Sequence, residues 1–329
     1  MKMLKGLAAV IVLVGASAAG AATNWTMVSG YPEESFLTKN LRQFISEVDK
    51  ETKGELKIDL RSNDTLIKHD AIKRAVQAGQ VQIGEIRLGV YGNESPMYIL
   101  DSLPNIAATY EEATLLTEAG KPFFDKLFAK NGMRIITYVA WPGQGFYTKT
   151  PATTVADFKG KKLRIYSAAT QKMGDMLGFQ STILPFAEVP QAFSTGLIES
   201  LFTSAQTGVD TQAWDNVKYF TYTGTMHNKN AVVVNERAFR SLGKDVQKVL
   251  LEAGERASRR GWEMSKAANE EKVATLKANG MVVTDASPEI QAALQKVGQT
   301  MMEEWSSSAA PEERAVLDAY LKLKGAKPN

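Results

Sequence analysis

The chain has 329 residues and no cysteine, and its 39 Lys and Arg residues against 36 Asp and Glu residues give a net charge of +3. The absence of cysteine excludes a disulfide framework, thiolate chemistry and a lipidated cysteine after a leader. The weak positive charge is spread along the chain rather than clustered, so we expect no nucleic-acid partner.

The N-terminus has the three regions of a secretory signal peptide. Two lysines precede an uncharged apolar run at 7–14, which is too short to span a bilayer permanently, and small residues follow. Cleavage after Ala18 or Ala22 fits these small residues, and we favour Ala22, which makes residues 1–22 the signal peptide. Because no second such run occurs, we predict that the mature chain of 307 residues (329 minus 22) is a soluble periplasmic protein.

Strand and helix patterns alternate through the first third of the mature chain. Strands are predicted at 24–30, 55–60 and 81–89, and helices at 32–54 and 66–79 between them. This β-α-β-α-β order predicts an α/β fold with a mostly parallel sheet and helices on both of its faces.

A second set of α/β units follows a helix at 110–132 and two strands at 133–141 and 143–150. Its predicted strands lie at 161–166, 181–186 and 200–204, and helices at 168–178 and 188–196 separate them. After a strand at 229–235, a helical pattern runs from about Glu236 to Ala278. A helix of that length extends about 60 Å, which exceeds one lobe. Two tail helices complete the chain.

These patterns predict two lobes and one long helix that spans both of them. The first lobe is expected to comprise 23–141 plus about 230–269, and the second 142–229 plus about 270–329. A cleft between two α/β lobes is a common place for a small ligand, which is captured as the lobes close.

The sequence offers little for catalysis. The two histidines, His69 and His227, have no Cys, second His or Asp at metal-ligand spacing, so a structural role is predicted for both and no metal or cofactor is expected. GxSxG, HExxH, P-loop and GxGxxG motifs are absent. We therefore predict a binding protein rather than an enzyme.

Arg164 is the principal candidate for binding a ligand. In the strand pattern KKLRIY, Leu163 and Ile165 share one face while Arg164 and Tyr166 share the other. A guanidinium binds a carboxylate with two parallel hydrogen bonds, so an arginine at an interlobe cleft suits an organic acid. On its own, Arg164 fits a surface arginine of an edge strand equally well.

Two linked motifs resemble the solute-binding proteins of TRAP (tripartite ATP-independent periplasmic) transporters, the DctP-type family. The first, "DFKGKKLRIY", matches the family's D-(L/F)-K-G-x-K-x-R strand, and the second, "EVPQAFSTG", matches its E-V-x-x-A-(L/F)-x-T-G helix. The similarity extends over nearly the whole mature chain and includes the leader and the long late helix. It implies a two-lobe periplasmic binding protein fold, with integral membrane subunits of a TRAP transporter as partners.

The resemblance also implies that Arg164 pairs with the carboxylate of the ligand. Many family members carry a second arginine where this chain has Gln144, which can bond a hydroxyl or keto oxygen but cannot match a second carboxylate. Arg87 could supply the missing cation, although pairing with Glu85 at the surface is an equal alternative. Further candidates near the expected cleft are Phe146, Tyr166, Phe186, Phe202, Ser204 and Trp214.

One carboxylate anchor among aromatic rings favours a monocarboxylate with an aromatic or apolar body, such as a 2-hydroxy or 2-oxo acid. A sugar acid such as a uronate is the alternative, with Gln144, Thr203 and Ser204 bonding its hydroxyls. A periplasmic ligand sensor and a periplasmic enzyme are further alternatives.

Overall fold

The computed structural model describes residues 22–325, so the predicted signal peptide lies outside the described residues except for Ala22. The strands are β1 (Thr23–Val28), β2 (Leu56–Arg61), β3 (Ile83–Arg87), β4 (Met133–Ala140), β5 (Gln144–Thr148), β6 (Lys162–Ile165), β7 (Gln180–Ile183), β8 (Ser200–Ser204), β9 (Tyr219–Tyr222), β10 (Lys229–Asn235) and β11 (Val282–Asp285). The α-helices are α1 (Phe36–Glu51), α2 (Ile72–Gln77), α3 (Tyr110–Lys130), α4 (Ala168–Met176), α5 (Val189–Ser194), α6 (Ala205–Asp210), α7 (Glu236–Ser241), α8 (Lys244–Ala278), α9 (Pro288–Ser308) and α10 (Pro311–Gly325).

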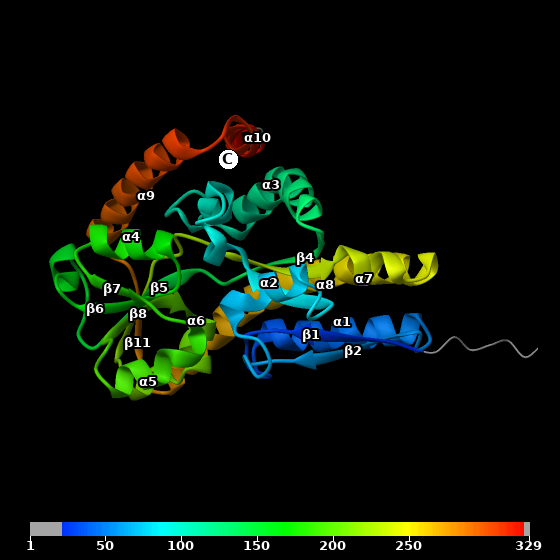
Figure 1. Ribbon diagram of the computed structural model, residues 1–329. Coiled ribbons are helices and arrows are strands. Elements are labelled where there is room, and N and C mark those ends of the chain that lie inside the picture. Colours follow the sequence, from blue (N-terminus) through cyan, green and yellow to red (C-terminus); the bar gives the residue numbers. More distant parts are fainter. Residues whose placement is uncertain (1–21, 326–329) are drawn as a thin grey trace, which may run out of the picture.

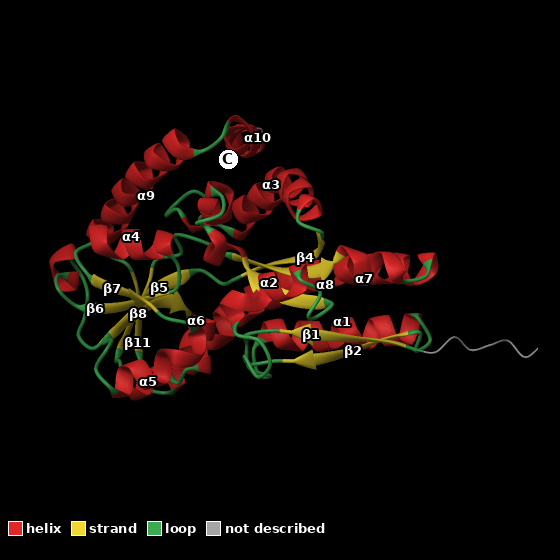
Figure 2. Ribbon diagram, in the orientation of Figure 1, coloured by secondary structure: helices red, strands yellow, loops and turns green. Residues whose placement is uncertain are grey.

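The strands form two separate mixed sheets, which lie on opposite sides of the molecule in Figure 1. The first sheet has the order β2-β1-β3-β10-β4 and the second has the order β11-β9-β5-β8-β6-β7. Helices cover the sheets, as the colouring in Figure 2 makes clear. The predicted α/β class and the two-lobe architecture are confirmed.

In each sheet, one strand runs against the direction of its neighbours. β10 is antiparallel to β3 and β4, and β5 is antiparallel to β8 and β9. Each of these strands follows directly after the chain crosses from the other sheet, β5 after β4 and β10 after β9. The two crossings therefore lie side by side, and residues 141–143 and 223–228 connect the sheets.

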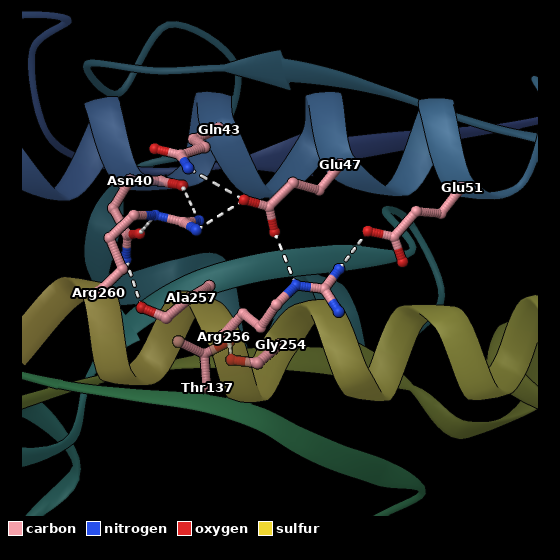
Figure 3. Close-up of polar contacts among 9 residues, drawn as sticks. All are labelled: Asn40, Gln43, Glu47, Glu51, Thr137, Gly254, Arg256, Ala257 and Arg260. Atoms are coloured by element: carbon pink, nitrogen blue, oxygen red, sulfur yellow. Dashed lines mark hydrogen bonds and ion pairs between the residues drawn. The ribbon is translucent and has the colours of Figure 1, made fainter.

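The long helix α8 packs against both sheets. It contacts α1 and β4 of the first lobe and α6 and β11 of the second. Figure 3 shows the first contact: Arg256 and Arg260 of α8 both pair with Glu47 of α1, at 3.3 and 2.7 Å. Gly254 allows α8 to lie close to β4, because a Cβ there would come within 2.5 Å of the Ile136 carbonyl oxygen.

Several predicted element boundaries were wrong. The helical pattern from Glu236 to Ala278 is two helices, because the chain is extended at Leu242 and α8 begins anew after Gly243. The helix expected at 66–79 is shorter, since a turn precedes it and α2 begins only at Ile72. The strands β9 and β11 were not predicted, and each has only four residues.

The assignment of sequence ranges to lobes stays a prediction. The strands of each sheet fall in the ranges expected for that lobe. The last helix, α10, packs instead on α3, beside the first sheet. Its Tyr320 hydroxyl donates to the Ile106 carbonyl oxygen at 2.5 Å, and Lys324 pairs with Glu112 at 2.8 Å.

Candidate functional site

A cavity of about 350 Å³ lies between the two sheets, where loops follow the carboxyl ends of parallel strands from both. Its walls come from both lobes and from the crossings. The lining residues are Gly30, Tyr31, Asp64, Lys68, His69, Asp70, Arg87, Val90, Trp141, Gln144, Arg164, Tyr166, Ile183, Leu184, Pro185, Phe186, Ala187, Glu188, Thr203, Thr207 and Asn228.

Arg164 is a buried cation in the wall of this cavity. The side chain is 3% exposed, and its Nε donates to the Leu184 carbonyl oxygen at 3.1 Å. Within residues 22–325, no carboxylate pairs with the guanidinium, and neither Nη atom has a hydrogen-bond partner. Burial, and then the charge of nearby Arg87, lowers the pKa of Arg164 to about 9. The cavity wall therefore holds a destabilised positive charge that an anion would stabilise.

Arg87 brings a second guanidinium to the same cavity from the first sheet. Its Nη2 donates to the Tyr166 carbonyl oxygen at 2.6 Å, and the guanidinium stacks 4.1 Å from the centre of the Tyr166 ring. Its Nε is buried without a partner among the described residues. The alternative pairing with Glu85 does not occur, because the Glu85 carboxylate accepts hydrogen bonds from Ser29 and Asn230 instead.

Glu85 is linked to the cavity wall by a chain of hydrogen bonds. Burial raises its pKa to about 7 although Ser29 and Asn230 donate to it at 2.6 and 3.2 Å. Asn230 in turn accepts from the indole nitrogen of Trp141 at 2.8 Å. This chain of hydrogen bonds fixes the Trp141 ring, which lines the cavity.

Tyr166 and Gln144 form a polar contact within the second lobe. The Tyr166 hydroxyl lies 2.6 Å from Asn228 Oδ1 and 3.3 Å from Gln144 Oε1. The amide nitrogen of Gln144 donates to the Pro142 carbonyl oxygen at 2.7 Å. Gln144 is therefore largely occupied by the protein, which leaves one amide N–H for a ligand.

Aromatic rings from both lobes meet at one side of the cavity. Tyr31 makes edge contacts with Trp141 at 5.1 Å and Phe186 at 6.2 Å between ring centres. It also contacts the His69 ring at 5.2 Å. Because Phe186 belongs to the second lobe, this contact joins the lobes across the cavity.

The structure brings five of the nine predicted site residues together in the cavity lining: Arg164, Gln144, Tyr166, Arg87 and Phe186. Phe146 and Phe202 lie instead in the core, in an aromatic cluster with Phe158 and Phe179. Ser204 caps α6 by accepting from the Thr207 N–H, and Trp214 packs against the core of the second lobe. Among the described residues, these four side chains are not part of the lining.

Sequence reasoning missed Tyr31, Asp64, His69 and Asn228, all of which line the cavity. The His69 ring nitrogens are shielded from solvent and have no hydrogen-bond partner among residues 22–325. Burial, with a smaller contribution from the charge of Arg87, lowers the pKa of His69 to about 3. Tyr31, Asp64 and Asn228 lie in loops and His69 lies in a 3-10 turn before α2, where strand and helix periodicity carries no information.

Neither a metal centre nor a membrane span was found in the part of the chain that the structure describes. No group of three or more His, Cys, Asp or Glu side chains there is arranged to hold a metal ion. No helix between residues 22 and 325 combines the length and apolar character needed to cross a bilayer.

Comparison with known proteins identifies relatives over most of the chain. The family model described as bacterial extracellular solute-binding protein, family 7, matches residues 27–308. The C4-dicarboxylate-binding periplasmic protein DctP of Rhodobacter capsulatus is 30% identical over 220 residues, which are 64% of each chain.

Two crystal structures from Bordetella pertussis are more similar. DctP7 is 42% identical, with a TM-score of 0.89, over 91% of this chain and 99% of its own. DctP6 is 40% identical, with a TM-score of 0.90, over 91% of this chain and all of its own. Both are described as extracytoplasmic solute receptors that bind pyroglutamic acid.

Proposed function

Because the chain belongs to family 7 of the bacterial extracellular solute-binding proteins, the solute receptors of TRAP transporters, we propose that its ligand is a small cyclic monocarboxylate, with pyroglutamate as the leading candidate. The family and the fold are those of transport receptors that bind organic acids. The observation that carries the proposal is the buried Arg164 guanidinium in the cavity wall, which lacks any carboxylate partner within residues 22–325.

A single carboxylate suits the arrangement of the two arginines. Arg164 offers both Nη atoms, whereas Arg87 already uses Nη2 for the Tyr166 carbonyl oxygen. Arg87 comes from the first lobe and Arg164 from the second. One carboxylate that contacts both would bind the lobes to each other, so the closed state would have an affinity for the ligand that the open state lacks.

The size and polarity of the cavity favour a small ligand. About 350 Å³ is at the lower end of the range of about 300–1,000 Å³ typical of small-molecule sites. Gln144 is uncharged and already bonds to Pro142 and Tyr166. Position 144 therefore offers no cation for the second carboxylate of a dicarboxylate. Pyroglutamate has one carboxylate and a compact ring, and receptors 42% and 40% identical to this chain bind it.

The proposal is tested with protein that has been unfolded, freed of co-purified ligand and refolded. Calorimetric titrations would compare L-pyroglutamate with succinate, D-glucuronate and 2-hydroxy-3-phenylpropanoate, which represent dicarboxylates, sugar acids and aryl 2-hydroxy acids. We expect pyroglutamate to bind at least about a hundredfold more tightly than each of the others. Tighter binding of glucuronate would favour the sugar-acid alternative, and tighter binding of succinate would contradict the monocarboxylate assignment.

Delivery to integral membrane subunits of a TRAP transporter is the second part of the proposal, and membership of the family supports it. In proteoliposomes that contain such subunits and an ion gradient, the purified receptor should stimulate uptake of labelled pyroglutamate. Stimulation should disappear with Arg164→Ala. Equal uptake with and without the receptor would contradict the proposed delivery.

A further inference from the structure

Two loops of the first lobe form one wall of the cavity. One loop follows β1 and contains Gly30, and the other follows β2 and contains Asp64. Backbone hydrogen bonds join them, from Asn63 N–H to the Tyr31 carbonyl oxygen at 2.9 Å and from Asp64 N–H to the Ser29 carbonyl oxygen at 3.2 Å. The two loops therefore hold each other in place.

The backbone of this wall is left-handed at two consecutive residues. Asn63 and Asp64 have φ values of 53° and 56°, in the left-handed region that Asn and Asp adopt more readily than other residues with a side chain. The two residues form a turn in the loop after β2. The conformation places the Asp64 side chain at the cavity.

Gly30 leaves room for the His69 ring. A Cβ at position 30 would lie 2.5 Å from His69 Nδ1, so any larger residue there would displace the ring. His69 therefore packs against the backbone of the first loop and against Tyr31. The position of the imidazole is fixed even though it makes no hydrogen bond within residues 22–325.

Asp64 and His69 both have unused hydrogen-bonding atoms. Asp64 Oδ1 and both ring nitrogens of His69 are shielded from solvent and have no partner among the described residues. The Asp64 carboxylate accepts a hydrogen bond from the backbone N–H of His69, and both residues line the same cavity. Buried polar atoms in native proteins are nearly always paired, so a ligand in the cavity is the natural partner.

The pair offers complementary functions. A carboxylate oxygen accepts hydrogen bonds, while a neutral imidazole donates from one nitrogen and accepts at the other. His69 is neutral near pH 7 because its pKa is lowered to about 3. An acceptor beside a donor matches the edge of a cis amide, which presents an N–H next to a carbonyl oxygen. A lactam ring has such an edge.

We propose that Asp64 and His69 are the specificity-determining pair of the site, with Asp64 Oδ1 accepting the lactam N–H of the ligand and His69 donating to the lactam carbonyl oxygen. This assignment rests on the proposed function, because it presupposes a ligand whose carboxylate binds Arg164. The two arginines then select for an acid, and the Asp64–His69 pair selects for an amide among acids.

Isosteric ligands test the assignment of Asp64. In 5-oxotetrahydrofuran-2-carboxylate, a ring oxygen replaces the lactam N–H, while the carboxylate and the carbonyl group remain. We expect the wild-type protein to bind pyroglutamate at least about a hundredfold more tightly than this lactone, since the lactone leaves Asp64 unpaired and places an oxygen against it. Equal affinities in the calorimeter would overturn the assignment.

Variants of Asp64 test whether this residue causes the preference for the lactam over the lactone. Asp64→Ala should reduce the preference for the lactam to a few-fold, and Asp64→Asn should retain part of it, because an amide oxygen still accepts and Asn tolerates the left-handed conformation. Asp318→Ala is the control for loss of an acidic side chain, since Asp318 is exposed on α10 and outside the cavity lining, and the full preference should remain. An unchanged preference in Asp64→Ala would overturn the assignment.

The variant His69→Ala tests the hydrogen bond that His69 is proposed to donate to the carbonyl oxygen of the ligand. It should weaken the lactam and the lactone by similar factors, because both carry the carbonyl oxygen, and should leave cyclopentanecarboxylate, which lacks that oxygen, unaffected. Similar losses for all three acids would overturn the role of His69. If pyroglutamate does not bind the wild-type protein, the proposed function fails and the pair fails with it, whereas tight binding without lactam preference overturns only the pair.

Discussion

Arg164 and Glu85 are both buried charges near the cavity, but their surroundings differ. Glu85 receives two hydrogen bonds from neighbouring side chains, whereas Arg164 receives no counter-charge within residues 22–325. Burying an unpaired charge costs several kcal/mol. A protein that retains such a group at the wall of a cavity has placed it where an anionic ligand can pair with it. Glu85, in contrast, maintains the wall through Asn230 and Trp141.

The first prediction concerns Glu85. A carboxyl whose pKa rises from 4.5 to about 7 on folding binds more protons in the folded state than in the unfolded state between those pH values. Stability therefore falls by about 3 kcal/mol as the pH rises through that window. In Glu85→Gln this contribution is absent.

Urea unfolding of both proteins from about pH 4.5 to pH 8 measures this effect. The difference in unfolding free energy between wild type and variant should change by about 3 kcal/mol across the window, in favour of the variant at high pH. His69, with its lowered pKa, gives a slope of opposite sign that is present in both proteins and cancels. Parallel pH profiles would contradict this role of Glu85.

The sequence predicted Arg164, which lines the cavity, but not the whole lining. Arg164 could be predicted because it alternates with apolar residues in a short strand and because its motif resembles that of a known family. Asp64 and His69 could not, since their positions depend on a left-handed turn and on the missing side chain of Gly30. Nothing in the local sequence pattern shows that these two loops meet.

At the scale of elements, β5 explains why the aromatic prediction was partly wrong. Gln144 and Phe146 lie two residues apart and share one face of β5, but of the two only Gln144, the first residue of the strand, lines the cavity. Phe146 pairs with Phe202 on β8, and both pack in the core with Phe158 and Phe179. Since both faces of this sheet are covered, alternation does not distinguish a core position from a cavity position.

Phe146 therefore affects stability rather than affinity. Phe146→Ala should reduce the unfolding free energy by about 3–5 kcal/mol, because the removed ring leaves a void among closely packed rings. Calorimetry at a temperature where the variant is folded should give an unchanged Kd for pyroglutamate. Phe146→Leu provides a milder version if the alanine variant does not fold. A large loss of affinity in a folded variant would place the ring in the site after all.

At the scale of the whole molecule, the two crossings and α8 connect the two sheets (Figure 1). The α/β alternation was sufficient to predict two lobes and a spanning helix. It could not predict that β5 and β10 run antiparallel to their neighbours, because this depends on where the chain enters each sheet. It also could not place α10 against α3, which depends on long-range contacts such as that of Tyr320.

Closure of the lobes gives a third prediction. Arg87 contacts the second lobe through Tyr166, and a carboxylate held by Arg87 and Arg164 would add a second connection. Small-angle X-ray scattering of wild-type protein should show a smaller radius of gyration when pyroglutamate is added. In Arg87→Ala, saturating pyroglutamate should produce less compaction, and the affinity should be lower. Equal compaction of both proteins would show that Arg87 does not couple binding to closure.

The central claim is that the unpaired guanidinium of Arg164 holds the carboxylate of the ligand, and the Kd of pyroglutamate for Arg164→Ala tests it most directly. The exposed Arg240→Ala serves as the control for loss of a positive charge. Isothermal titration calorimetry should show about 2–4 kcal/mol of weakened binding in Arg164→Ala and no change in Arg240→Ala, with both variants folded. An Arg164→Ala protein that binds pyroglutamate as tightly as the wild type would contradict the account.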